Sequence, residues 1–122
     1  MAAPRQTHVD AFATASRPRV ALVIPTLNEE EPIGEVIRAI PRDAVDEVIV
    51  VDSASEDRTV ERARDSGAHV IVERQRGYGR ACAAGARAAA DCGVIVFLDG
   101  DGSDRPELVP LLLAPITCCS WA

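Results

Sequence analysis

The sequence predicts an α/β fold, with a mostly parallel sheet of about four strands and helices on both faces. Short apolar runs rich in β-branched residues alternate with longer helical patterns along the chain. This alternation is typical of parallel sheets whose two faces are both covered. In addition, unusual polar residues follow every apolar run, and in such a fold they meet at one edge of the sheet.

The strands and helices are expected in strict alternation. The four strands cover residues 20–24, 47–51, 69–73 and 94–98. The helices cover residues 29–40, 57–67 and 76–93, and a short one starts at Pro106. Gly67 ends the second helix at a position typical of a left-handed C-terminal cap. Each helix therefore joins or follows strands of one sheet.

Composition limits the function classes. The chain has 122 residues, of which 48% are apolar and 26% charged, as expected for one globular domain. The net charge of −6 argues against a nucleic-acid-binding protein, which needs a basic face. The four cysteines lack paired C-x-x-C spacing, so we expect reduced cytosolic thiols rather than a zinc site.

The chain is predicted to divide into three parts. Residues 1–18 form a flexible polar leader, without an apolar stretch long enough for a signal peptide. Residues 19–116 form the α/β domain, and residues 117–122 form an atypical tail with two adjacent cysteines and a tryptophan. No apolar run approaches the roughly 18 residues of a membrane span.

The stretch VIVFLDGDGSD contains the strongest functional signal. Asp99, Asp101 and Asp104 follow an apolar strand directly, with no cation nearby in the sequence. Crowded carboxylates repel one another unless something positive lies between them. Turn formation alone does not explain Asp99 and Asp101 beside the strand, so we predict a metal site there.

The other polar segments each have a purely structural alternative. Asn28 and Glu29 can cap and charge the following helix. The segment from Asp52 to Asp57 can form a turn and a helix cap. Gly77, Gly79 and Gly85 can serve only to let a helix approach the sheet, and Arg76 and Arg80 are expected to be solvated unless an anion is present.

Four segments together resemble the family 2 glycosyltransferases of the GT-A fold, in particular the polyprenyl-phosphate and dolichyl-phosphate sugar transferases. They are VIPTLNEEEPI, VDEVIVVDSASEDRT, RGYGRACAAGARAA and VIVFLDGDGSDRPELVP, in the family's order. The resemblance extends over about residues 19–116. It implies a Rossmann-like half that binds a nucleotide sugar.

The resemblance also implies roles for individual residues. Pro25, Leu27 and Glu29 would lie against the nucleotide, and Asp52 would accept a hydrogen bond from a ring N–H of the base, with Asp57 supporting that loop. The metal ligands would be Asp99 and Asp101, which match the family's D-x-D motif. Gly100 would keep the backbone slim beside the donor, and Ser103 replaces a longer polar side chain. All of these residues except Asp57 are predicted to bind the nucleotide sugar.

The implied reaction transfers a sugar from a UDP- or GDP-linked donor, with Mg²⁺ or Mn²⁺ and with inversion, to an acceptor such as a polyprenyl phosphate. The family's acceptor side lies beyond the D-x-D motif, where this sequence has only residues 102–122. We therefore expect an incomplete domain, with nucleotide binding without catalysis as the alternative. The expected location is cytoplasmic, or peripheral at the cytoplasmic face of the membrane, and the oligomeric state stays open.

Three rival classes fit less well. A haloacid-dehalogenase-like phosphatase places its D-x-D near the start of a domain. An EF-hand loop from Asp99 needs glycine and glutamate where Asp104 and Pro110 stand. A Rossmann dehydrogenase needs its glycine motif after the first strand, whereas GYGRACAAG follows the third.

Overall fold

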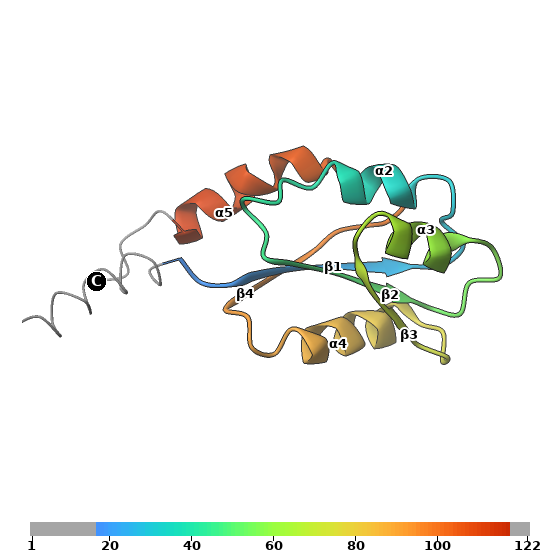
Figure 1. Ribbon diagram of the computed structural model, residues 1–122. Coiled ribbons are helices and arrows are strands. Elements are labelled where there is room, and N and C mark those ends of the chain that lie inside the picture. The colour runs from blue at the N-terminus through green and yellow to red at the C-terminus, as the bar shows by residue number, and fades with distance from the viewer. Residues whose placement is uncertain (1–16, 118–122) are drawn as a thin grey trace, which may run out of the picture.

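The computed structural model describes residues 17–117 (Figure 1). The strands are β1 (Val20–Thr26), β2 (Glu47–Asp52), β3 (His69–Val72) and β4 (Val94–Phe97). The helices are α2 (Ile33–Arg38), α3 (Thr59–Asp65), α4 (Tyr78–Ala88), the 3-10 turn η1 (Pro106–Leu108) and α5 (Val109–Thr117). All four predicted strands and the helix that starts at Pro106 are confirmed.

The four strands form one sheet in the order β3-β2-β1-β4, and all three neighbouring pairs are parallel. The parallel α/β prediction is therefore confirmed. The chain moves outward from β1 to β3 and then returns to the other side of β1 with β4. This reversal leaves the carboxyl ends of β1 and β4 as neighbours, which is where ligands bind in open sheets of this kind.

Helices cover both faces of the sheet, as Figure 1 shows, with α2, α3 and α5 on one side and α4 on the other. On the first side the apolar core includes Ile33, Ile37, Ala63 and Leu113. On the second side Ala81 and other small residues of α4 pack against β1 and β2. The two cores hold the sheet rigidly, so the loops at its edge start from fixed points.

Glycine allows α4 to lie close to the sheet at one position. A Cβ atom on Gly85 would lie 2.3 Å from Cγ1 of Val23, which is closer than real Cβ atoms come. Gly79 has nothing within 4 Å of such an atom, so the close-approach explanation holds for Gly85 and not for Gly79. The predicted left-handed cap at Gly67 is confirmed by its φ of +98°.

Two residues of the expected leader contact the domain. Arg17 pairs with Asp46 at 2.8 Å, and Pro18 packs against Gly93, where an added Cβ atom would lie 2.8 Å away. The rest of the leader and the tail residues 118–122 lie outside the described residues. Of the helices in residues 17–117, none is long and apolar enough to cross a membrane.

Apolar side chains remain exposed on the β4 side of the fold. Phe97 is 44% exposed, and Leu111 and Leu112 on α5 are 72% and 62% exposed. β4 has a strand partner on one side only among the described residues. Among the described residues, apolar side chains are thus exposed beside the edge of the sheet at β4.

Candidate functional site

The loops that follow β1 and β2 are fastened to each other. The backbone N–H of Asn28 donates to Oγ of Ser55 at 2.8 Å, and Oδ1 of Asn28 accepts from the N–H of Glu56 at 3.0 Å. Asn28 has a φ of +56°, a region that asparagine tolerates better than most residues. Asn28 therefore ties two loops together and does not cap α2, whose N-cap residue is Pro32.

A second set of contacts joins the start of α3 to the segment that follows β1. The N–H of Glu29 donates to Oγ1 of Thr59 at 2.8 Å, and the N–H of Glu30 donates to Oδ2 of Asp57 at 3.4 Å. Asp57 also accepts from the N–H and the hydroxyl of Thr59. Burial alone would raise the pKa of Asp57, but the hydrogen bonds from Thr59 and Glu30 outweigh it and lower that pKa. These contacts explain why α2 starts at Ile33 rather than at Glu29.

Asp52 lies at the end of β2 as predicted, but its carboxylate points into the protein. The residue is 0% exposed. Oδ1 accepts from the hydroxyls of Thr26 at 2.9 Å and Ser55 at 2.5 Å, and Oδ2 accepts from the N–H of Ser55 at 2.7 Å. The pairing of Thr26 with Asp52 in the sheet register brings these groups together. Asp52 thus holds the loop, and its carboxylate is occupied by the protein itself.

Arg76 is exposed to solvent, as expected, and it also donates hydrogen bonds to this network. Its Nε donates to the carbonyl of Ser53 at 3.2 Å, and one terminal nitrogen donates to the carbonyl of Ala54 at 3.2 Å. Ala54 has a φ of +58°, which is costly for a residue with a Cβ atom. The guanidinium therefore holds a strained segment in place beside the ends of β1 and β2.

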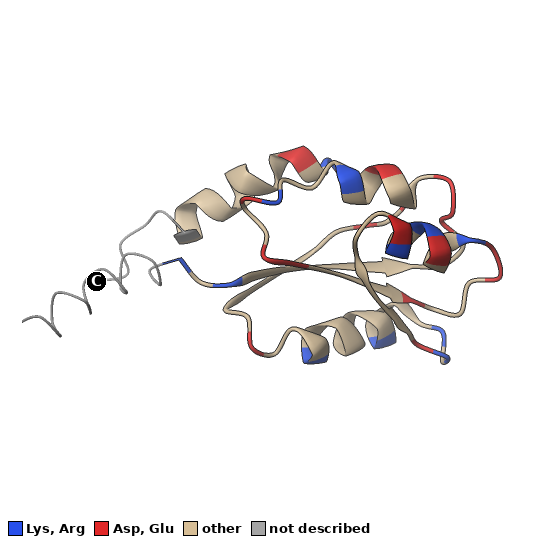
Figure 2. Cartoon of the chain, in the orientation of Figure 1, with Lys and Arg blue, Asp and Glu red and all other residues tan. Residues whose placement is uncertain are grey.

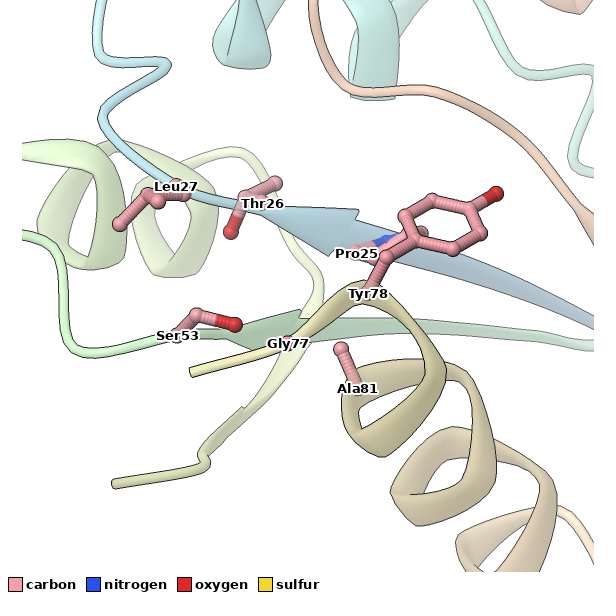
Figure 3. A pocket seen from close by; sticks show the side chains of 7 residues that line it. All are labelled: Pro25, Thr26, Leu27, Ser53, Gly77, Tyr78 and Ala81. Atoms are coloured by element: carbon pink, nitrogen blue, oxygen red, sulfur yellow. The ribbon is translucent and has the colours of Figure 1, made fainter. Parts of the chain in front are cut away.

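A pocket of about 300 Å³ opens between these loops and the start of α4 (Figure 3). Its lining residues are Pro25, Thr26 and Leu27 from β1 and the residue after it, Ser53 after β2, and Gly77, Tyr78 and Ala81 at the start of α4. The predicted residues Pro25 and Leu27 are therefore brought together, and Ser53, rather than its neighbour Asp52, lines this pocket.

The loop after β4, which we call the acid loop (Asp99–Asp104), is held mainly by its own hydrogen bonds. Oδ1 of Asp101 accepts from the hydroxyl of Ser103 at 2.6 Å and from its N–H at 2.9 Å. These two bonds lower the pKa of Asp101. Oδ2 of Asp104 accepts from the N–H of Asp99 at 2.9 Å. Ser103 therefore orients the carboxylate that we predicted to bind metal.

The acid loop and the segment after β1 bring negative charges together. Partial burial raises the pKa of Glu29, and the charges of Asp101, Asp57 and Asp99 raise it further. Figure 2 shows acidic residues on the loops that follow β1 and β2, at the right of the view. Glu29, Asp99 and Asp101 thus follow β1 and β4 at the same edge of the sheet, as the sequence predicts.

Gly100 has a packing role within the acid loop. A Cβ atom there would lie 2.8 Å from Cγ2 of Thr26 and 3.2 Å from Cγ2 of Ile24. The residue is buried, whereas Asp101 beside it is exposed. The absence of a side chain lets the loop lie against β1, which brings the two aspartates to the edge next to the pocket.

The donor set suits a hard divalent cation that is shared with a phosphate ligand. Among residues 17–117, no three His, Cys, Asp or Glu side chains gather closely enough to hold a metal by themselves. Asp99 and Asp101 offer carboxylate oxygens. Both hydrogen bonds from Ser103 go to Oδ1 of Asp101, and no described residue donates a hydrogen bond to its Oδ2. Mg²⁺ is commonly bound by one or two carboxylates together with water and substrate phosphates. The residues present fit that pattern.

Ser53 and Tyr78 are the site residues that sequence reasoning missed. Ser53 directly follows a strand, and Tyr78 is the chain's single tyrosine, placed between two glycines. These two features of the sequence are the signals that could have pointed to Ser53 and Tyr78. Their side chains enter the pocket because of contacts between distant segments, which the sequence pattern does not specify.

The fold and the site define a class: an open parallel α/β protein with a pocket and a carboxylate cluster at the reversal between β1 and β4. The chain matches the family described as glycosyl transferase family 2 over residues 21–117, and it belongs to that family. The resemblance found in the sequence is thereby confirmed.

Curated and solved relatives agree with this assignment. Glucosyl-3-phosphoglycerate synthase of Mycolicibacterium smegmatis is 38% identical, over 95% of this chain and 42% of its own length. Dolichyl-phosphate hexose transferase of Haloferax volcanii is 44% identical, over 77% of this chain and 41% of its own length. The chain thus spans about two fifths of the length of these relatives.

A solved relative has the same fold. It is the crystal structure of glucosyl-3-phosphoglycerate synthase from Mycobacterium tuberculosis, in complex with Mn²⁺, UDP and glucosyl-3-phosphoglycerate. It is 37% identical and has a TM-score of 0.73, with 86% of this chain and 41% of that chain covered. The GT-A fold prediction is confirmed.

Proposed function

We propose that this chain binds the donor in a metal-dependent, inverting transfer of a sugar from a nucleoside diphosphate to a phosphate-bearing acceptor. One observation carries the proposal: Asp99 and Asp101 follow β4 at the reversal point of the sheet, and Gly100 between them packs against Thr26, which lines the pocket. No arginine of residues 17–117 forms an ion pair with Asp99 or Asp101, and a divalent cation bound with a diphosphate would provide the missing positive charge.

Different residues of the chain would bind different parts of the nucleotide-sugar donor. The pocket would hold the base, and Asp99 and Asp101 would hold the cation at the diphosphate. The cation, acting as a Lewis acid, would neutralise negative charge on the diphosphate leaving group. Ser103 would keep Asp101 oriented, and Gly100 would keep the acid loop against β1.

The acceptor class rests on the relatives. One relative is named for a dolichyl phosphate and another for a phosphoglycerate product. Both names contain a phosphate group, and a polyprenyl phosphate is our first candidate for this chain. Transfer to such a lipid would take place at the cytoplasmic face of the membrane. Donor binding without transfer is the second candidate function, because the described residues at this edge account for the donor alone.

Calorimetry with UDP and GDP in the presence of Mn²⁺, followed by excess chelator, tests the proposal. We expect chelator, or the variant Asp101→Asn, to weaken nucleotide binding by about tenfold or more, as expected for loss of a metal-bridged diphosphate. Asp65→Asn, an exposed carboxylate at the far end of α3, is the matched control and should bind as the parent does. Binding that is unchanged by chelator would overturn the metal assignment.

A product assay separates the two candidate functions. The chain is incubated with labelled UDP- and GDP-sugars, Mn²⁺ and a polyprenyl phosphate, and lipid-linked sugar is then extracted. Metal-dependent lipid product that is absent from the Asp101→Asn sample would support transfer. Tight nucleotide binding with no product would support the binding function.

A further inference from the structure

One segment of this acidic chain carries positive charge alone. Residues 74–90, which include α4 and the loop before it, contain four arginines and no aspartate or glutamate, whereas the whole chain has a net charge of −6. Figure 2 shows the contrast with α2 and α3 on the other side of the sheet, where basic and acidic residues both occur. We call the four residues the α4 arginine face: Arg74, Arg76, Arg80 and Arg87.

The α4 arginine face is turned away from the sheet. Its four residues are all exposed. Arg80 and Arg87 are seven positions apart, which is about two helical turns, so they project from the same side of α4. Ala81 and Gly85 are buried against the sheet on the other side of the helix. The exposed residue between the two arginines is Ala83, whose side chain is short, so the guanidinium groups extend beyond the rest of this surface.

No acidic side chain of residues 17–117 pairs with the α4 arginine face. The ion pairs in that part of the chain belong to four other arginines: Arg17, Arg19, Arg58 and Arg62. Arg76 donates to the backbone carbonyls of Ser53 and Ala54, which are uncharged and leave its positive charge in place. Four positive charges on one side of the molecule are therefore available to an anionic partner.

The spacing of these charges fits a flat anionic surface rather than one small anion. Arg80 and Arg87 are roughly 10 Å apart along the helix, at 1.5 Å per residue, so a single phosphate group does not contact both. Separate headgroups of a bilayer can contact each arginine, and each arginine near such a surface strengthens binding by about fivefold. The acids of α2 and α3 lie across the sheet (Figure 2), and salt screens charges beyond about 8 Å at physiological ionic strength.

We propose that the α4 arginine face docks the protein on a bilayer that contains anionic phospholipid. The choice of partner rests on the proposed function, in which the acceptor is a lipid phosphate. Gly77, Tyr78 and Ala81 at the start of α4 line the pocket, so docking through α4 holds the candidate site beside the surface that carries such an acceptor. The contact is made by charged side chains, so binding is reversible and sensitive to salt.

Sedimentation of the full chain with lipid vesicles tests the inference. One set of vesicles contains phosphatidylcholine alone, and the other contains phosphatidylcholine mixed with phosphatidylglycerol. We expect binding to the anionic vesicles to be about tenfold tighter or more, and to be lost in 1 M salt, where the Debye length is about 3 Å. The double variant Arg80→Gln with Arg87→Gln should weaken that binding by about tenfold or more, because glutamine keeps the helix propensity and removes the charge.

The matched control is the double variant Arg38→Gln with Arg64→Gln, which removes the same charge from exposed positions on α2 and α3, across the sheet from α4 (Figure 1). It should bind anionic vesicles as the parent does. Equal weakening by the two double variants, or equal binding of the parent to both kinds of vesicle, would overturn the inference. Tighter binding to a single-stranded oligonucleotide than to anionic vesicles would also overturn it, because the partner would then be nucleic acid.

Calorimetry with UDP and Mn²⁺ separates this inference from the proposed function. The α4 double variant should bind the nucleotide as the parent does, because the inference gives these arginines no contact with the donor. Nucleotide binding by a parent chain that does not bind anionic vesicles would overturn the inference and leave donor binding standing. Vesicle binding without nucleotide binding would overturn the proposed function and leave the docking surface standing.

Discussion

The two parts of the candidate site are built in different ways. The loops after β1 and β2 are fastened to each other by hydrogen bonds between segments more than 20 residues apart, and Asp52 is buried at their centre. The acid loop after β4 is exposed from Asp101 to Asp104, and its hydrogen bonds join residues no more than five positions apart. The loops after β1 and β2 are thus part of the fold, whereas the hydrogen bonds of the acid loop are those of local turns.

The largest expected contrast is in stability. Asp52→Ala should lower the free energy of unfolding by about 3 kcal/mol, because three buried hydrogen bonds to a carboxylate are lost. Asp101→Ala, on the exposed acid loop, should change it by less than about 0.5 kcal/mol. Urea unfolding of both variants without metal measures the difference. Equal losses would mean that the acid loop is as integral to the fold as the loops after β1 and β2.

Comparing the stability of two glycine variants shows which part of the acid loop is packed against the rest of the fold. Gly100→Ala should destabilise the protein by about 2 kcal/mol, because the new Cβ atom would overlap Thr26. Gly102→Ala has ordinary spacing to Pro32 and suffers only from its φ of +85°, so we expect a loss of about 1 kcal/mol or less. Thermal unfolding compares the two. A larger loss for Gly102→Ala would place the anchor at the tip of the loop rather than at β1.

The smallest expected effect tests the repulsion between the two sides. The pKa of Glu29 is raised in the folded protein, so its charged form destabilises the fold once the pH exceeds that pKa. Glu29→Gln should therefore stabilise the protein at pH 7 by less than about 1 kcal/mol. The gain should vanish below about pH 4, where Glu29 is protonated in both the folded and the unfolded chain.

Urea unfolding across this pH range checks the dependence, with Glu35→Gln on the exposed side of α2 as the control. We expect the control variant to show no comparable gain. A loss of stability at pH 7 in Glu29→Gln would contradict the idea that Asp99 and Asp101 repel Glu29 across the two sides.

The sequence by itself determined the strands, their parallel arrangement and the edge where the acids gather. Runs such as Val20–Ile24 are short, apolar and rich in β-branched residues, which favours a buried strand, and parallel strands joined by helices bring their carboxyl ends to one edge. The positions of Glu29, Asp99 and Asp101 follow from that rule alone. Their convergence could therefore be predicted without coordinates.

Only the tertiary structure decided which side chains face the pocket. Thr26 and Asp52 are 26 residues apart, and Ser53 and Arg76 are 23 residues apart, yet their contacts turn the carboxylate of Asp52 inward and hold Ser53 at the pocket wall. Side-chain direction after a strand depends on such partners from other elements, and no local pattern specifies them. Asp52 and Ser53 are neighbours in the sequence with opposite roles, because register and packing set the direction in which each one points.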